Sequence, residues 1–150
     1  VTYPTMAEEL TILERVDSGV LESDYHTDAA VSLQDVARLQ NEAKKVRVSQ
    51  NIYKYVINIV NATRNVPSVL GPEMDGFVQY GGSPRASIAF LKSARALALL
   101  SKRDYVVPED IKALRHVVLR HRVVVTYEAE AEGVTSENLV DRIFERIPTP

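Results

Sequence analysis

Apolar residues recur every three or four positions along most of the chain, which is the spacing of one face of an α-helix. The intervening positions are mostly polar, so the predicted helices are amphipathic. Each predicted helix begins at a capping residue or a proline that suits a helical first turn. These starts are Thr5, Ser32, Ser49, Ser83, Pro108 and either Thr135 or Ser136. The pattern predicts an all-α protein, a small helical bundle with short extended links.

The segments between these helices carry further predictions. Residues 1–4 resemble the end of a strand, and residues 17–27 are polar and turn-rich, which is typical of a linker. Residues 66–80 contain Pro and Gly at intervals and are predicted to form a loop. A single helix is predicted from Pro108 to Leu119, followed by a brief β-prone run at residues 123–125.

The helix predicted from Pro84 to Leu100 is expected to lie at the centre of the fold. It is apolar around most of its girth, so it should be covered on more than one side. Gly81 and Gly82 precede it and allow the backbone to bend. Ser83 can then cap the first turn, and Pro84 fits the first helical position because its missing N–H group is not needed there.

Arg85 is the candidate functional residue of this helix. The chain has no Asp or Glu between Gly76 and Arg103, so this stretch is basic. Arg85 lies in the first turn, where the helix dipole favours anions and a fixed cation is mildly unfavourable. A cation at this place is reasonable if an anion such as phosphate binds beside it. The alternative is that Arg85 pairs with a carboxylate or a carbonyl of a neighbouring helix.

Composition narrows the class of protein. The chain has 150 residues, of which 45% are hydrophobic and 25% charged, as in soluble globular proteins. Its net charge of −2 argues against nucleic-acid binding by the whole surface. No Cys is present, which excludes disulfides and thiolate metal sites. No apolar run approaches the roughly 20 residues that span a membrane. The first residue is Val, which suggests a piece of a longer protein.

A search for catalytic motifs finds none. The chain lacks a Gly-rich loop with Lys and Ser or Thr, paired acidic residues for magnesium, and a Ser/His/Asp set. His116 and His121 are five residues apart and do not share a helix face, so no metal site is predicted. The basic cluster from Arg115 to Arg122 is interpreted as cations at a helix C-terminus, with phosphate contacts to nucleic acid as the minor alternative. On its own, the chain is expected to be inactive as an enzyme.

Several stretches of the chain form a set of motifs that occur together. They are Gly81–Ser87, Ala94–Leu100, Arg103–Leu114, Val118–Arg122 and Tyr127–Thr135, with Tyr3-Pro4 and Glu8-Glu9 near the start. This set resembles the C-terminal part of the MoxR-type AAA+ ATPases, and the resemblance covers essentially the whole chain. It implies that residues 1–30 are the last strand and helix of the nucleotide-binding core with a linker, and that residues 31–150 are the helical lid.

The resemblance also implies a function. Ser83, Pro84 and Arg85 match the sensor-2 motif, in which the arginine contacts the γ-phosphate of ATP held by the core. The Walker A, Walker B, sensor-1 and arginine-finger elements of the family lie upstream of this chain. ATP and Mg²⁺ would therefore bind to the full-length parent, and this piece alone would bind neither.

The implied partners follow from the same resemblance. They are the AAA+ core of the same chain, further copies in a homo-hexamer, and von Willebrand factor A-domain proteins, in a cytoplasmic chaperone-like remodelling system. The alternative is a helical protein-interaction or nucleic-acid-binding module that does not depend on nucleotide.

Overall fold

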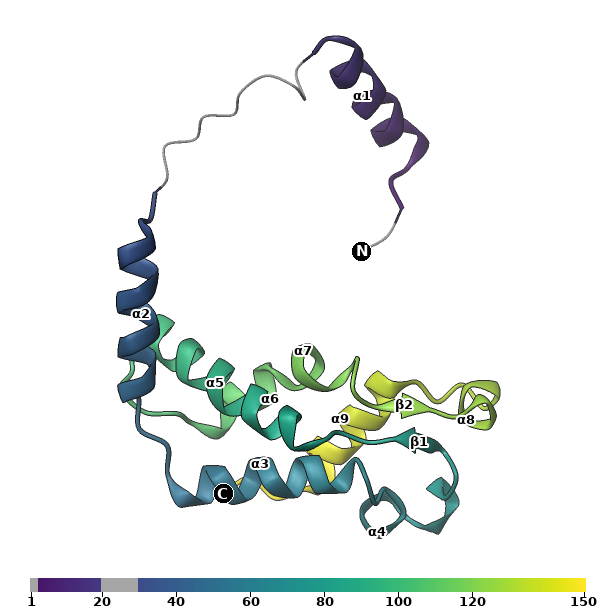
Figure 1. Cartoon of the computed structure of the whole chain (residues 1–150). Coiled ribbons are helices and arrows are strands. Elements are labelled where there is room, and N and C mark those ends of the chain that lie inside the picture. The colour runs from purple at the N-terminus through teal and green to yellow at the C-terminus, as the bar shows by residue number, and fades with distance from the viewer. Residues whose placement is uncertain (1–2, 20–29) are drawn as a thin grey trace. The chain divides into compact units, whose positions relative to one another are not determined.

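The computed structural model describes residues 3–19 and 30–150, which form two compact units that divide after Ser32. The described elements are almost entirely helical, so the predicted all-α class is confirmed (Figure 1). The first unit contains α1 (Met6–Asp17). The second unit, from Leu33 to Pro150, contains the other described helices and a small two-stranded sheet.

Helix α1 begins as predicted. The side chain of Thr5 accepts from the N–H of Glu8 at 3.4 Å, and the carboxylate of Glu8 accepts from the N–H of Thr5 at 2.7 Å, which is a capping box. None of its side chains is buried within the described residues. The predicted opening strand is not seen at Tyr3 and Pro4, and its residues 1–2 lie outside the described residues. Most of the predicted linker at 17–27 also lies outside them.

The second unit is organised around one long helix, as the sequence predicts. Helix α5 packs against α2, α3, α6 and α7. The elements of this unit, in chain order, are α2 (Leu33–Lys45), α3 (Gln50–Ala62), α4 (Pro67–Leu70), the 3₁₀ helix η1 (Pro72–Met74), β1 (Val78–Tyr80), α5 (Pro84–Leu100), α6 (Pro108–Ala113), α7 (Arg115–Leu119), β2 (Val124–Val125), α8 (Tyr127–Ala131) and α9 (Ser136–Arg146).

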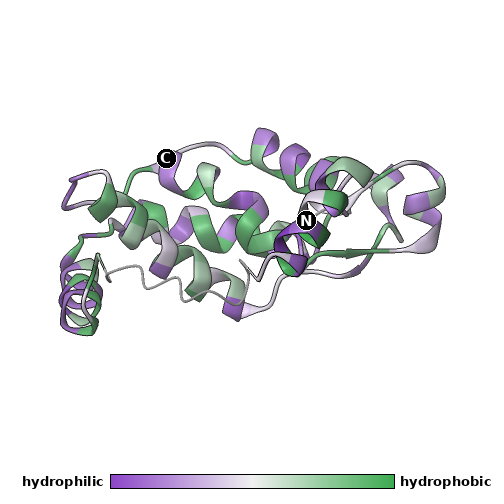
Figure 2. Cartoon of the chain, turned by 90° about the horizontal axis from the view of Figure 1, so that it is seen from above, coloured by the Kyte–Doolittle hydropathy of each residue, from purple (hydrophilic) through white to green (hydrophobic). Residues whose placement is uncertain are grey.

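The buried face of α5 is narrow. Ala86, Phe90, Ala94 and Ala98 are buried at every fourth position, and three of these four side chains are alanines. Helix α5 is covered on more than one side, as expected, by the four helices that pack against it, but part of its surface stays exposed. Leu100 there is 75% exposed within the part of the chain that the structure describes. Along the helices, hydrophobic and hydrophilic residues alternate turn by turn, as amphipathic packing requires (Figure 2).

The core of this unit lies between α3, α5 and α9. Fully buried aliphatic side chains from α3 and α9 meet Phe90 of α5 there. The ring of Phe144 is 6.3 Å from that of Tyr55 in an edge-to-face arrangement, and 6.3 Å from that of Phe90 at a tilted angle. These aromatic contacts add packing energy beyond the buried area and tie α9 to both α3 and α5.

The prediction of a loop over residues 66–80 is wrong. This segment contains α4, η1 and β1, because Pro67 and Pro72 each occupy the first position of a short helix. Met74, the last residue of η1, is buried. Strand β1 pairs antiparallel with β2, which brings residues about fifty positions apart into one small sheet.

One further prediction about the second unit is wrong. The helix expected from Pro108 to Leu119 is interrupted at Leu114, whose φ of −91° and ψ of −1° end α6 before α7 begins. The acidic stretch after Val125 is helical and forms α8, whose cap is Thr126. The extended links are confirmed, because Arg47 and Tyr105 form a parallel bridge between them.

Candidate functional site

The start of α5 has the local structure that the sequence predicts. Ser83 is the N-cap, and its hydroxyl oxygen accepts from the N–H of Arg85 at 3.3 Å. Pro84 occupies the first helical position. The side chain of Arg85 is exposed and forms no hydrogen bond or ion pair with any described residue. The alternative in which Arg85 pairs with a neighbouring carboxylate or carbonyl is therefore not seen.

A buried hydroxyl at the end of α3 holds the start of α5 in place. The N–H of Gly82 donates to Oγ1 of Thr63 at 2.8 Å, and this hydroxyl donates to the carbonyl of Val60 at 2.7 Å. Thr63 is 0% exposed and is the C-cap residue of α3. We call this pair of hydrogen bonds the Thr63 latch. It fixes the backbone immediately before the cap, and so fixes where Arg85 projects.

The two glycines before α5 serve this latch rather than a bend in the backbone. Neither has a positive φ. A Cβ at Gly81 would lie 2.3 Å from the carbonyl oxygen of Thr63, and one at Gly82 would lie 3.3 Å from its hydroxyl. Gly81 is therefore required for the close approach of two backbone segments. The sequence-based explanation of these glycines is corrected accordingly.

Replacing Thr63 by Val should lower the free energy of unfolding by about 1–3 kcal/mol. The new side chain has nearly the same shape but leaves the buried N–H of Gly82 without an acceptor. Chemical denaturation of the chain measures the loss. Thr63→Ser keeps the hydroxyl and is the matched control, so it should lose clearly less. Equal losses in the two variants would show that the hydrogen bond does not hold the start of α5.

The basic residues near Arg85 have different environments. Lys92 follows Arg85 by two helical turns on the exposed side of α5. Arg103 is tied down instead, because it forms a two-pronged pair with Asp110 at 2.9 and 2.6 Å. Hydrogen bonding to Asp110 raises the pKa of Arg103 above its ordinary value. Arg103 therefore has a structural role, whereas the side chain of Arg85 has no partner among the described residues.

Three residues of the second basic cluster, which runs from Arg115 to Arg122, contact carboxylates of α9. Arg115 Nε lies 2.5 Å and His116 Nε2 3.0 Å from the same oxygen of Asp141, and Arg120 pairs with Glu137. The hydrogen bond from Arg115 holds the pKa of Asp141 below its ordinary range. Each of these three basic residues is more than ten positions from its carboxylate partner, so the spacing of residues in the sequence could not reveal the pairs.

The described residues contain no group of three or more His, Cys, Asp or Glu side chains that could hold a metal ion. They also contain no helix long and apolar enough to cross a membrane.

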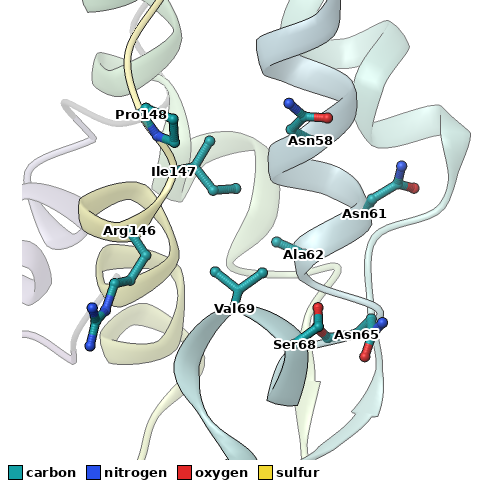
Figure 3. A pocket seen from close by; sticks show the side chains of 9 residues that line it. All are labelled: Asn58, Asn61, Ala62, Asn65, Ser68, Val69, Arg146, Ile147 and Pro148. Atoms are coloured by element: carbon teal, nitrogen blue, oxygen red, sulfur yellow. The ribbon is translucent and has the colours of Figure 1, made fainter.

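A pocket that the sequence did not predict lies between α3, α4 and the segment after α9 (Figure 3). Its volume is about 570 Å³. Asn58, Asn61 and Asn65 line one wall at successive turns near the end of α3, and Arg146 lies on the other side. None of Ser83, Pro84 and Arg85 lines it. The repeat of asparagines every three or four positions was the only sequence signal for it.

Comparison with known proteins defines the class of this fold. Residues 75–143 match the family model of the AAA lid domain. A crystal structure described as a "putative ATPase" from Cytophaga hutchinsonii superposes with a TM-score of 0.82 at 35% identity, over 100% of this chain and 45% of that chain. The second unit thus contains an AAA lid domain over residues 75–143.

Similar proteins of known sequence identify the family of this chain. The chain is 38% identical over 149 residues to the uncharacterized protein YeaC of Bacillus subtilis, covering 99% of this chain and 43% of that protein. It is 37% identical over 151 residues to chaperone MoxR1 of Mycobacterium tuberculosis, covering 100% of this chain and 39% of that protein. The chain belongs to the MoxR-type AAA+ family. It spans about two fifths of the length of these relatives.

Proposed function

We propose that this chain is the lid of a nucleotide-dependent remodelling protein, in which Arg85 binds the γ-phosphate of ATP held by the AAA+ core. The observation that carries the proposal is the exposed side chain of Arg85, without a described partner, at the capped start of α5. The sensor-2 role of Ser83, Pro84 and Arg85 and the domain boundary near residue 30 are parts of this proposal.

The chemistry at the start of α5 suits a phosphate. The N-terminal end of a long helix carries partial positive charge, and the guanidinium adds a full charge with paired N–H donors. Phosphate oxygens match that fork geometry and accept charge-assisted hydrogen bonds from it. Mg²⁺ binds oxygen ligands such as carboxylates. The described residues contain no group of three or more side chains that could bind a metal ion. ATP and Mg²⁺ would accordingly be held by the core, which supplies the chemistry of hydrolysis.

Arg85 acts in this proposal as a state-dependent contact. While the terminal phosphate is present, Arg85 pairs with it and favours the closed position of the lid. When that phosphate is gone, Arg85 loses its partner and the open position is favoured, because only a differential interaction can shift the two populations. The Thr63 latch keeps the start of α5 fixed to α3, so Arg85 moves together with the helices of the lid.

The wider context of the proposal follows from the family. One relative is named a chaperone, which supports a chaperone-like role in remodelling or maturing other proteins. We propose that the parent assembles as a homo-hexamer through its AAA+ parts. Proteins with von Willebrand factor A domains are proposed as its partners.

The proposal is tested by following the lid in the full-length protein. The absence of Cys from this chain permits a single dye at Glu128→Cys on α8, which is exposed, with the second dye on the core. A slowly hydrolysed ATP analogue should change the energy transfer between the dyes relative to ADP. The same analogue should cause little change when Arg85 is replaced by Ala. An unaltered response in that variant would overturn the assigned role.

A further inference from the structure

A groove with an apolar floor runs between α2 and α5. Its floor contains Val36 and Leu39 from α2 with Ala96, Leu99 and Leu100 from α5, and its volume is about 580 Å³. We call it the α2–α5 groove. It lies toward the C-terminal half of α5, whereas Arg85 lies at the opposite end of that helix.

The apolar residues of this groove are unusually accessible. Helix α2 is clearly amphipathic and packs on α5, yet none of its residues is buried within the described chain. Val36 is 43% exposed, Leu39 46% and Leu100 75%. Apolar side chains that gather in a concave surface are typical of binding sites rather than of ordinary surface.

The edge of the groove is positively charged. Lys44, Lys92 and Arg95 line it, and no acidic residue is among the described residues that do. The Nε–H group of Arg95 is buried and has no hydrogen-bond acceptor in the described part of the chain. A buried donor of a charged group without an acceptor is costly, so this position favours an acceptor brought by a partner.

We propose that the α2–α5 groove binds an amphipathic α-helix of a partner protein that carries Asp or Glu beside its apolar row. The apolar row would lie on Val36, Leu39 and Leu99, as in other helix-in-groove complexes. A carboxylate at the edge of that row would accept from Arg95. Lys44 and Lys92 attract further acidic residues on either side, which gives the site its preference for an acidic helix.

This inference does not depend on nucleotide, so it is tested on the chain itself without ATP. The probe is a dye-labelled synthetic helical peptide about four turns long, with Leu at every third or fourth position and Glu on the flanks. The comparison peptide has Lys in place of each Glu. Fluorescence anisotropy should show binding of the Glu peptide only, and its affinity should fall as salt is added.

Groove variants make the test specific. Leu39→Asp should weaken binding of the Glu peptide by at least about tenfold, and Arg95→Gln by about tenfold, because each removes one part of the recognition. Val117→Asp is the matched control, since Val117 is 70% exposed on α7 and does not line the groove. This variant should bind like the wild type. Thermal unfolding followed by circular dichroism checks that each variant is folded.

Several results would overturn the proposal. They are no saturable binding of the Glu peptide, equal binding of the Lys peptide, or equal binding by wild type and Leu39→Asp. A wild-type dimer in sedimentation that Leu39→Asp dissociates would also overturn it, because the groove would then be occupied by a second copy. The peptide test uses no nucleotide. A negative result in it would therefore leave the proposed role of Arg85 unaffected.

Discussion

Replacing Arg85 by Ala in the full-length protein is expected to lower ATP turnover by about a hundredfold, the scale of losing one charge-stabilising donor at a reacting centre. The stability of the lid should stay within about 0.5 kcal/mol of wild type, because the side chain is exposed and has no described partner. Arg85→Lys keeps the charge but not the paired donors, so its turnover should fall between those of wild type and Arg85→Ala. Steady-state ATP hydrolysis measures turnover, and chemical denaturation measures stability.

The control for this prediction is Lys54→Ala, which removes an exposed cation from α3. This variant should hydrolyse ATP like the wild type. ATP-driven assembly, followed by size-exclusion chromatography, should be impaired in Arg85→Ala and normal in Lys54→Ala. Wild-type turnover and assembly in Arg85→Ala would show that Arg85 is not the phosphate contact.

The largest expected effect on stability comes from Asp110, one of the few buried charged residues described. Its carboxylate accepts from both terminal nitrogens of Arg103 and from the N–H of Val107 at 2.9 Å. Asp110 is 4% exposed. Asp110→Ala should therefore lower the free energy of unfolding by about 3 kcal/mol, because it leaves Arg103 unpaired in a half-enclosed site and removes the cap of α6.

Asp104→Ala is the matched control for Asp110. Asp104 pairs with Arg47 at 2.9 Å, but both side chains are more than 70% exposed. Such surface pairs contribute little, so this loss should be below about 1 kcal/mol. Urea denaturation of the two variants under identical conditions makes the comparison. Losses of similar size would mean that burial does not distinguish the two ion pairs.

Features set by neighbouring residues were predictable from the sequence. The starts of α1, α3, α5 and α9 follow from Thr5, Ser49, Ser83 and Thr135, each of which caps its own helix through a contact two or three residues away. The place of Arg85 in the first turn of α5 followed from the same local signals. Its phosphate-binding role stays a prediction until it is tested.

Features that depend on distant residues were not predictable. The Thr63 latch joins residues 19 positions apart, and no local pattern around Thr63 indicates its partner. Gly81 suggested a bend, whereas the approach of the Thr63 carbonyl is what excludes a side chain there. The pairing of Arg115 with Asp141, 26 positions away, likewise arises only when α7 packs on α9.

The length of α5 gives the Thr63 latch a mechanical consequence. Helix α5 has 17 residues, and a helix of that length extends for about 25 Å. Because α5 packs on α2, α3, α6 and α7, the lid would turn as one body about Arg85 in the proposed mechanism, and Leu100 is the residue of α5 farthest from that pivot. A rotation of about 10° about that pivot would carry Leu100 through roughly 4 Å. A rotation that barely moves Arg85 would thus shift the opposite end of α5 much further.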